Sequence, residues 1–310
     1  MRIAVIGVPW NSKGARDGEA QAPKVLRESG LLVALTNGGR NQVMDYGDVE
    51  FSDPVPERSE SGIIAEAAFR EMVLGTRAAV KRAIADNRFP VVVGGECPLL
   101  LGCLAAANEA SDQRRVGLLF VDGHEDSYPP LSSLTGESAD MALGLALGLT
   151  SYHGFPELNP LPGSEYPLWL LRKNDALVLG TRDRAVLEEE EIPLLATVPV
   201  SCDSEERLHR ILSPRYVSEV VRCLGAVAKR WWFHLDLDVL SSEAFPAVRY
   251  EQPGGLSWEE LEMITQAALA APECVGWNIT IYNPDLDPDR HHGTRLVEFL
   301  AAVAQQMPAR

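Results

Sequence analysis

Short apolar runs alternate with helical hydrophobic patterns along the whole of this 310-residue chain. A strand that is buried on both faces reads as a continuous apolar run, and its parallel neighbour is reached through a crossover helix. The alternation therefore predicts an α/β fold in which helices cover both faces of a parallel sheet. The runs expected to form strands are Arg2–Gly7, Pro90–Val93, Val116–Val121, Ala176–Gly180, Trp231–Asp236 and Val275–Ile281, with weaker candidates at Gln42–Met44 and Ala196–Val200.

Three segments carry apolar residues at helical spacing, namely Gly62–Asn87, Ser257–Ala270 and Gly293–Gln306. We expect each to form a helix. Ser257 precedes Glu260 by three residues, which is the pattern of a capping box at a helix start. No internal repeat or low-complexity linker divides the chain, and the Pro-rich segment Phe155–Pro167 is expected to be a surface excursion. We therefore predict one domain over residues 1–310.

The chain carries 28 Lys and Arg against 44 Asp and Glu, which gives a formal charge of −16. Non-specific binding to nucleic acid or to an anionic membrane needs a basic surface, so this charge argues against both partners. No apolar run approaches the roughly 18 residues of a membrane span. The five cysteines are scattered without a CxxC pair, and the chain starts without a signal-peptide pattern. These features predict a cytoplasmic protein without a disulfide framework.

The residues that directly follow the apolar runs are the most informative, because open parallel sheets bind ligands at the carboxyl ends of their strands. Asp122, His124 and Asp126 follow one run at alternate positions. Asp236 and Asp238 show the same alternation at the end of another. Side chains on extended backbone alternate with period two, so each set points to one side.

If the two strand ends converge, four carboxylates and one imidazole share a small volume. Carboxylates that lie so close repel one another and tend to protonate unless a cation neutralises them. One nitrogen with several oxygens suits Mn²⁺, with Zn²⁺, Fe²⁺ or Ni²⁺ as alternatives. A single DxD pair, or a single His after a strand, is more often structural. The joint occurrence at two strand ends is what predicts a metal site.

The motifs around these residues resemble those of the arginase-like ureohydrolase superfamily over nearly the whole chain. The matching segments are Gly7-Val8-Pro9-Trp10, Ser12-Lys13-Gly14, Ala22-Pro23-Lys24-Val25-Leu26-Arg27, Asp45-Tyr46-Gly47-Asp48, Gly94-Gly95-Glu96-Cys97, Asp122 to Asp126, Gly180-Thr181-Arg182-Asp183, His234-Leu235-Asp236-Leu237-Asp238 and Asn283-Pro284. The resemblance implies a three-layer α/β/α sandwich with a roughly eight-stranded, mostly parallel sheet. It also implies a binuclear Mn²⁺ centre, a small-molecule substrate and a homo-oligomer, commonly a trimer or hexamer.

Carried over by motif, the resemblance also implies roles for the metal-binding residues. Asp122 and Asp236 would bridge the two ions, His124 and Asp238 would complete one site, and Asp126 would belong to the other. A hydroxide formed from metal-bound water would attack a planar carbon. Asp126 would hold that hydroxide and pass its proton to the leaving amine.

Three positions depart from the family pattern. Cys97 stands where the family has a metal-binding His; it is either a thiolate ligand, which would favour Zn²⁺, or a small buried residue beside a weak or empty site. Ile281 replaces the Glu that binds a guanidinium, so the usual charge-assisted recognition is lost. Thr135 replaces a His that assists proton transfer.

Two neighbouring features bear on catalysis and substrate choice. Glu137 is either a substitute acid/base or cation-binding group, or a Glu in the first turn of a helix, where the macrodipole favours it. Ala185 stands where arginases carry a carboxylate that binds the substrate's α-amino group. We therefore do not expect L-arginine to be the substrate on this resemblance alone. The acidic run from Glu188 to Glu191 resembles a solvated helix face.

We therefore predict a metal-dependent hydrolase of C–N bonds in a guanidino, amidino or amide-type substrate, with an altered substrate pocket. Two alternatives remain open. Asp122, His124 and Asp238 also form the ligand set that holds a single Zn²⁺ in the related deacetylase fold, which would give a single-metal amidohydrolase. The second alternative is a catalytically retired protein that serves as a metal-binding scaffold, and it is motivated by the losses at Ile281 and Thr135.

Overall fold

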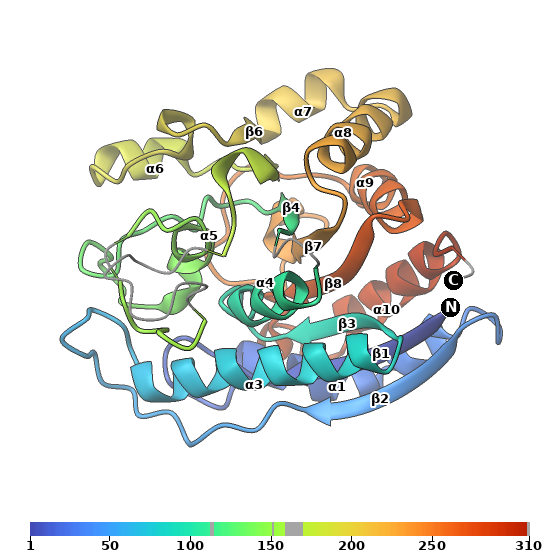
Figure 1. Ribbon diagram of the computed structural model, residues 1–310, viewed down its shortest axis with the longest axis horizontal. Coiled ribbons are helices and arrows are strands. Elements are labelled where there is room, and N and C mark those ends of the chain that lie inside the picture. The colour runs from blue at the N-terminus through green and yellow to red at the C-terminus, as the bar shows by residue number, and fades with distance from the viewer. Residues whose placement is uncertain (112–114, 151, 159–169, 309–310) are drawn as a thin grey trace.

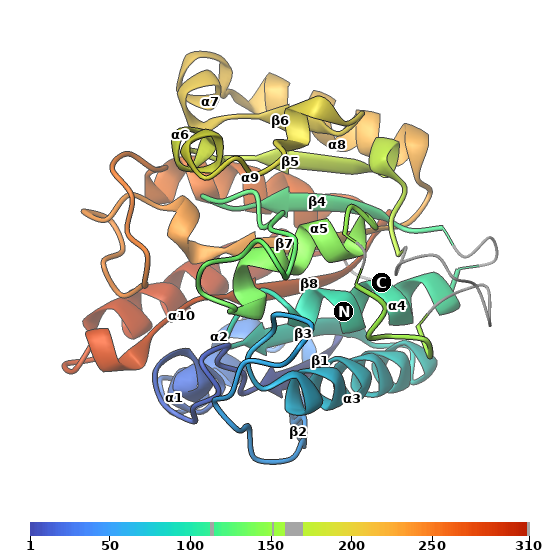
Figure 2. The same ribbon diagram turned by 90° about the vertical axis from the view of Figure 1, so that its left-hand side faces the viewer.

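The computed structural model describes residues 1–111, 115–150, 152–158 and 170–308. Within these residues, eight strands form one sheet in the order β2-β1-β3-β8-β7-β4-β5-β6, and every neighbouring pair is parallel. Figure 1 shows β2 at the bottom of the stack and β6 at the top, and Figure 2, in which β5 is also labelled, shows the whole order. In chain order the strands are β1 (Arg2–Val8), β2 (Gln42–Asp48), β3 (Phe89–Gly94), β4 (Gly117–Val121), β5 (Ala176–Leu179), β6 (Ser201–Asp203), β7 (Trp231–Asp236) and β8 (Cys274–Thr280).

Helices cover both faces of the sheet, as Figures 1 and 2 show together. Alternate residues of one strand enter different cores: Ile3 and Val5 pack on one side, Ala4 and Ile6 on the other. The first side is closed by α1 (Ala22–Glu28), α2 (Leu31–Leu35), α7 (Glu205–Ile211), α8 (Pro214–Val227), α9 (Trp258–Ala270) and α10 (His291–Ala304). The second is closed by α3 (Glu66–Ala85), α4 (Leu99–Glu109) and α5 (Ala142–Ala146). A short helix, α6, spans Arg184–Glu189.

The α/β fold and the six stronger strand predictions are confirmed, with ends that differ by at most one residue. The three helix predictions are confirmed as α3, α9 and α10. Ser257 and Glu260 form the capping box: the Ser257 hydroxyl accepts from the Glu260 amide at 3.2 Å, and the Glu260 carboxylate accepts from the Ser257 amide at 2.9 Å.

The strand predicted at Ala196–Val200 is wrong. That segment contains a 3-10 turn at Leu195–Thr197, and the strand that follows is β6 at Ser201–Asp203. An edge strand pairs on one side only and keeps partly exposed side chains, so β6 lacks the continuous apolar run by which the inner strands are found. Of the predicted surface excursion Phe155–Pro167, the part from residue 159 onward lies outside the described residues.

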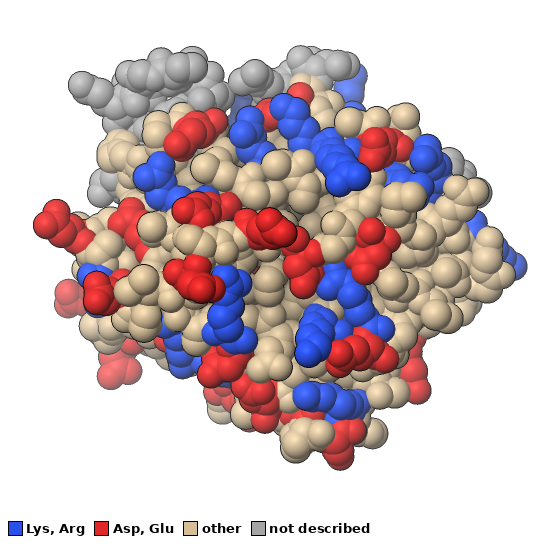
Figure 3. All heavy atoms as spheres, turned by 90° about the horizontal axis from the view of Figure 1, so that it is seen from below, with Lys and Arg blue, Asp and Glu red and all other residues tan. Residues whose placement is uncertain are grey.

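Within the described part of the chain, no helix is long and apolar enough to cross a membrane. On the face that Figure 3 shows, acidic and basic side chains are interspersed among uncharged ones, and neither sign covers a continuous area. The charge of −16 is therefore not gathered into one field on this face.

Candidate metal centre

The predicted metal-binding side chains come from the carboxyl ends of neighbouring strands. Asp122 directly follows β4, Asp236 ends β7, and Cys97 lies in the turn between β3 and α4. Strand β7 pairs with β4 on one side and with β8 on the other, and β8 pairs with β3. This strand order brings the three side chains to one edge of the sheet, as the position of parallel strand ends requires.

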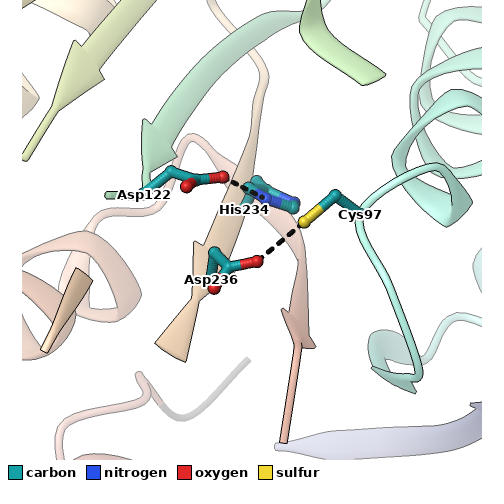
Figure 4. A group of neighbouring side chains, drawn as sticks. All are labelled: Cys97, Asp122, His234 and Asp236. Atoms are coloured by element: carbon teal, nitrogen blue, oxygen red, sulfur yellow. Dashed lines mark hydrogen bonds and ion pairs between the residues drawn. The ribbon is translucent and has the colours of Figure 1, made fainter. Parts of the chain in front are cut away.

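Two groups of potential ligand atoms share Asp122, and within each group the atoms lie within 4.8 Å of one another. We call Asp122, His124 and Asp238 the outer group, because the His124 side chain is 20% exposed. We call Cys97, Asp122, His234 and Asp236 the inner group, because all four are buried. Figure 4 shows the inner group with Asp122 directed at the His234 ring and Asp236 directed at the Cys97 sulfur.

In the outer group His124 and Asp238 form an ion pair. The Nδ1 atom of His124 lies 2.8 Å from Asp238 Oδ2 and 3.9 Å from Asp122 Oδ1. Burial lowers the pKa of His124, but the charge of Asp238 and its hydrogen bond outweigh burial and raise the pKa to about 9. For Asp238 burial acts in the opposite direction and raises the pKa. The charge of His124, its hydrogen bond and the charge of Arg182 outweigh burial and lower the pKa of Asp238 to about 2. A metal ion bound here would displace the proton of His124.

Backbone groups hold the outer carboxylates in place. The Gly123 amide donates to Asp238 Oδ1 at 3.0 Å, and the His124 amide donates to Asp122 Oδ1 at 2.7 Å. The Asp238 amide in turn donates to Asp236 Oδ1 at 2.7 Å. Each carboxylate thus has one oxygen directed by the main chain, which is how a ligand set is oriented before an ion arrives.

In the inner group the Cys97 thiol donates to Asp236 Oδ2 at 2.8 Å. The Thr280 hydroxyl donates to the same oxygen at 3.3 Å. Burial and the charge of Asp236 raise the pKa of the Cys97 thiol well above its usual range. Burial lowers the pKa of His234 to about 3. The inner group is therefore a neutral thiol and a neutral imidazole among carboxylates.

The residues present fit a divalent cation. Asp122 Oδ2 and Asp126 Oδ2 are buried without a hydrogen-bond partner among the described residues. Burial first, and then the charges of neighbouring carboxylates, raise the pKa values of Asp122, Asp126 and Asp236 well above the usual range. Buried polar atoms are normally paired, so such orphaned oxygens around a shared volume indicate a missing positive charge.

Asp126 lies beside the two groups but belongs to neither. Its backbone is left-handed, with φ +44°, and its carbonyl accepts from the Gly144 amide at 2.9 Å. Its carboxylate lines the cavity above the groups, which has a volume of about 280 Å³. The structure thus brings all six predicted metal-binding residues (Cys97, Asp122, His124, Asp126, Asp236 and Asp238) to one site, and all of them except Asp122 line the cavity.

Glu137 lines the same cavity and is 7% exposed. Its Oε1 atom accepts from the Tyr250 hydroxyl at 2.9 Å and lies 3.7 Å from Lys13 Nζ. Its Oε2 atom is buried without a partner among the described residues. Glu137 precedes the 3-10 turn Ser138–Met141 and makes no side-chain cap with it. Glu137 therefore lines the cavity without capping the helix start through its side chain.

The positions that depart from the family pattern also lie at the cavity. Ile281 lines it, with φ +76°, and its amide donates to Gly95 O at 2.7 Å. Thr135 donates to Asp140 Oδ2 at 2.8 Å and accepts from the Glu137 amide at 3.0 Å. Ala185 is exposed. In the acidic run, Glu190 lines the cavity and accepts from the Tyr128 hydroxyl at 2.9 Å.

Sequence reasoning missed three residues of the site. His234 was noted only as the start of a motif, although its place two residues before Asp236 on one strand already put both side chains on the same face. Arg249 and Tyr250 line the cavity from the irregular segment between β7 and α9. That segment has no periodicity from which the direction of a side chain could be inferred.

Comparison with known proteins identifies the family of the chain. The family model described as "Arginase family" matches residues 1–306. Arginase-1 of Oryctolagus cuniculus is 27% identical over 307 residues, which covers 97% of this chain and 91% of the relative. The arginase of Bacillus caldovelox is 25% identical over 287 residues, with 92% of each chain covered.

The solved structure of the Bacillus caldovelox arginase superposes with a TM-score of 0.80 at 22% identity, covering 97% of this chain and 96% of that one. The formimidoylglutamase of Bacillus subtilis superposes with a TM-score of 0.71 at 14% identity, covering 98% and 86%. These likenesses show the same fold. Together with the family match over nearly the whole length, they show that the chain belongs to the arginase family of hydrolases.

Proposed function

We propose that the protein is a metal-dependent hydrolase that cleaves a C–N bond at a guanidino, amidino or amide carbon. The observation that carries this proposal is the outer group, Asp122, His124 and Asp238, of which His124 and Asp238 line a cavity in an arginase-family chain. The similar proteins have names that span this chemistry: they include arginases, a formimidoylglutamase and a proclavaminate amidino hydrolase.

Asp122, His124 and Asp238 would hold the catalytic ion, for which we propose Mn²⁺, with Zn²⁺ as the alternative. A second ion, as in the predicted binuclear centre, would depend on Cys97, Asp126 and Asp236. A bound ion lowers the pKa of water and polarises the scissile group. Asp126 would take the proton of the attacking water and deliver it to the leaving nitrogen, since its Oδ2 atom is unpaired and its carboxylate lines the cavity.

Substrate recognition would differ from that of a guanidinium-binding arginase. Ile281 offers the cavity an apolar surface, as do Leu134 and Val186. The unpaired Oε2 of Glu137 offers a charged acceptor for a cationic nitrogen of the substrate. We therefore propose a substrate with an apolar portion near Ile281 and a cationic group at Glu137.

The proposal is tested with metal-free protein reloaded with Mn²⁺ or Zn²⁺ and assayed for urea, ammonia or amine release. The panel consists of guanidino, amidino and amide compounds with and without a second cationic group. We expect metal-dependent release that Asp238→Ala abolishes. If the loaded protein holds its ion and turns over none of these classes, the hydrolase proposal is wrong and the retired-scaffold alternative is supported.

The single-metal alternative is favoured by one observation: the outer group has an imidazole paired with a carboxylate, whereas Cys97 occupies the position of the other expected imidazole. Elemental analysis of the purified protein separates the two cases, because the binuclear centre requires near two ions per chain and the alternative near one.

We also propose that the protein forms a homo-oligomer, a trimer or hexamer. Light scattering tests this by comparing the mass in solution with the 33.8 kDa of a monomer.

A further inference from the structure

His234 supplies the imidazole of the inner group, yet the proposed function does not use it. Its side chain is fully buried and stacks on Phe120, with ring centroids 4.5 Å apart and planes 10° from parallel. In this fixed orientation Nε2 faces Asp122 and Nδ1 faces Asn278 on the neighbouring strand β8. Figure 4 shows the ring directed at the Asp122 carboxylate.

Trp232, Asn278 and His234 form a row of hydrogen-bonded side chains, and Trp232 sets the direction of the hydrogen bonds along it. An indole N–H can only donate, and here it donates to Asn278 Oδ1 at 2.7 Å. The amide of Asn278 therefore presents its NH₂ to His234, with Nδ2 2.7 Å from Nδ1. Because Nδ1 must accept, the ring proton of His234 is on Nε2.

A histidine that binds a metal through Nε2 needs a lone pair there, and it normally donates its other ring N–H to an oxygen acceptor. Asn278 does the reverse, since it offers an N–H to Nδ1. From this geometry we infer that His234 is not a metal ligand but a fixed N–H donor to Asp122, and hence a positioning residue for the outer group.

The contacts of Asp122 fit this role. Nε2 of His234 lies 3.6 Å from Asp122 Oδ2, and neither atom has a hydrogen-bond partner among the described residues. A small approach of the two side chains would complete the bond. The other oxygen, Oδ1, accepts from the His124 amide at 2.7 Å and lies 3.9 Å from His124 Nδ1. His234 would thus hold one oxygen of Asp122 inward while the other stays directed at the outer group.

The inference rests on the proposed metal site at Asp122, but it does not depend on turnover. The first experiment is nitrogen NMR of the metal-free protein with labelled histidine, in which His234→Gln assigns the His234 signals among the six histidines. We expect a protonated Nε2 and an unprotonated Nδ1. A spectrum with the proton on Nδ1 would overturn the inference.

The second experiment reverses the polarity of the row. Asn278→Asp accepts from both Trp232 and His234, so the ring proton moves to Nδ1 and Nε2 becomes a free ligand beside Cys97. We expect Zn²⁺ to bind to the inner group about tenfold or more tightly, as for other changes around a metal-binding imidazole. Chelator competition with Zn²⁺ alone measures this affinity.

The double variant His234→Gln, Asn278→Asp is the matched control for the added charge. The gain in Zn²⁺ affinity must disappear in this double variant. A gain that persists comes from the new carboxylate alone and contradicts the inference.

If Asn278→Asp does not fold, Trp232→Phe tests the same hydrogen-bonded residues. Without the indole donor the Asn278 side-chain amide can rotate by 180°, so both tautomers of His234 should be seen by NMR. Gln also offers an N–H to Asp122, so loss of an ion in His234→Gln would identify His234 as a ligand and would overturn the inference. Failure of the proposed hydrolase activity would leave the tautomer result unchanged.

Discussion

The outer and inner groups share Asp122, but the negative charge of their buried carboxylates is compensated in different ways. In the outer group an ion pair between His124 and Asp238 balances the charge, and the His124 ring reaches a cavity. In the inner group the balance is made by protons: the Cys97 thiol donates to Asp236, and His234 is neutral and fully buried. The first arrangement can exchange a proton for an ion, whereas the second keeps its protons in place because burial opposes their loss.

The largest expected effect is at the outer group. Asp238→Ala removes the partner of His124 and one ligand at once, so bound metal should fall to background and activity with it. Metal content per chain measures the result, with the exposed Asp86→Ala as a matched control that should keep its metal. Full occupancy in Asp238→Ala would break the comparison between the two groups.

The next effect is at the cavity wall above the two groups. Glu137→Gln keeps the hydrogen-bonding shape but removes the charge, so kcat/KM for a cationic substrate should fall by about tenfold or more, the value of about 1.5–3 kcal/mol for a charged hydrogen bond. Metal content should not change, because Glu137 belongs to neither group. Equal losses for cationic and neutral substrates would contradict the proposed recognition.

A smaller effect is expected when the inner group is given the ligand that it lacks. Cys97→His should raise Mn²⁺ affinity there by about tenfold, because an imidazole binds Mn²⁺ where a protonated thiol does not. Cys97→Ser is the control and should show no gain. Isothermal titration of the metal-free variants measures both, and an unchanged affinity in Cys97→His would mean that the inner group cannot reorganise around an ion.

The smallest effect is on stability alone. Phe120→Leu removes the ring that stacks on His234, and it should lower the free energy of unfolding by about 1–2 kcal/mol through lost packing. Chemical denaturation of the metal-free protein measures this, with Phe51→Leu as a control at a half-buried aromatic. Metal binding at the outer group should be retained; its loss would show that the two groups are more tightly coupled than their hydrogen bonds indicate.

The contrast between the two groups also explains which features of the site could be predicted from the sequence. The inner strands, the edge at which they meet and the grouping of Asp122, His124, Asp126, Asp236 and Asp238 at that edge could be predicted, because period-two alternation and strand ends are local properties. The direction of the Trp232–Asn278–His234 row could not, since it depends on pairing between β7 and β8. Tyr250 reaches Glu137 across 113 positions of sequence, and no local pattern carries that contact.

Ile281 is a branched residue in a left-handed conformation, with φ +76°. Such a backbone is unfavourable for a branched side chain, by about 1–3 kcal/mol, and less so for an unbranched one. The main chain at this position therefore adopts a bend for which the Ile281 side chain is poorly suited. An unbranched Glu would suit this backbone better and would bring to the cavity a carboxylate that can pair with a guanidinium, so Ile281→Glu is a way to redirect this pocket toward guanidino substrates.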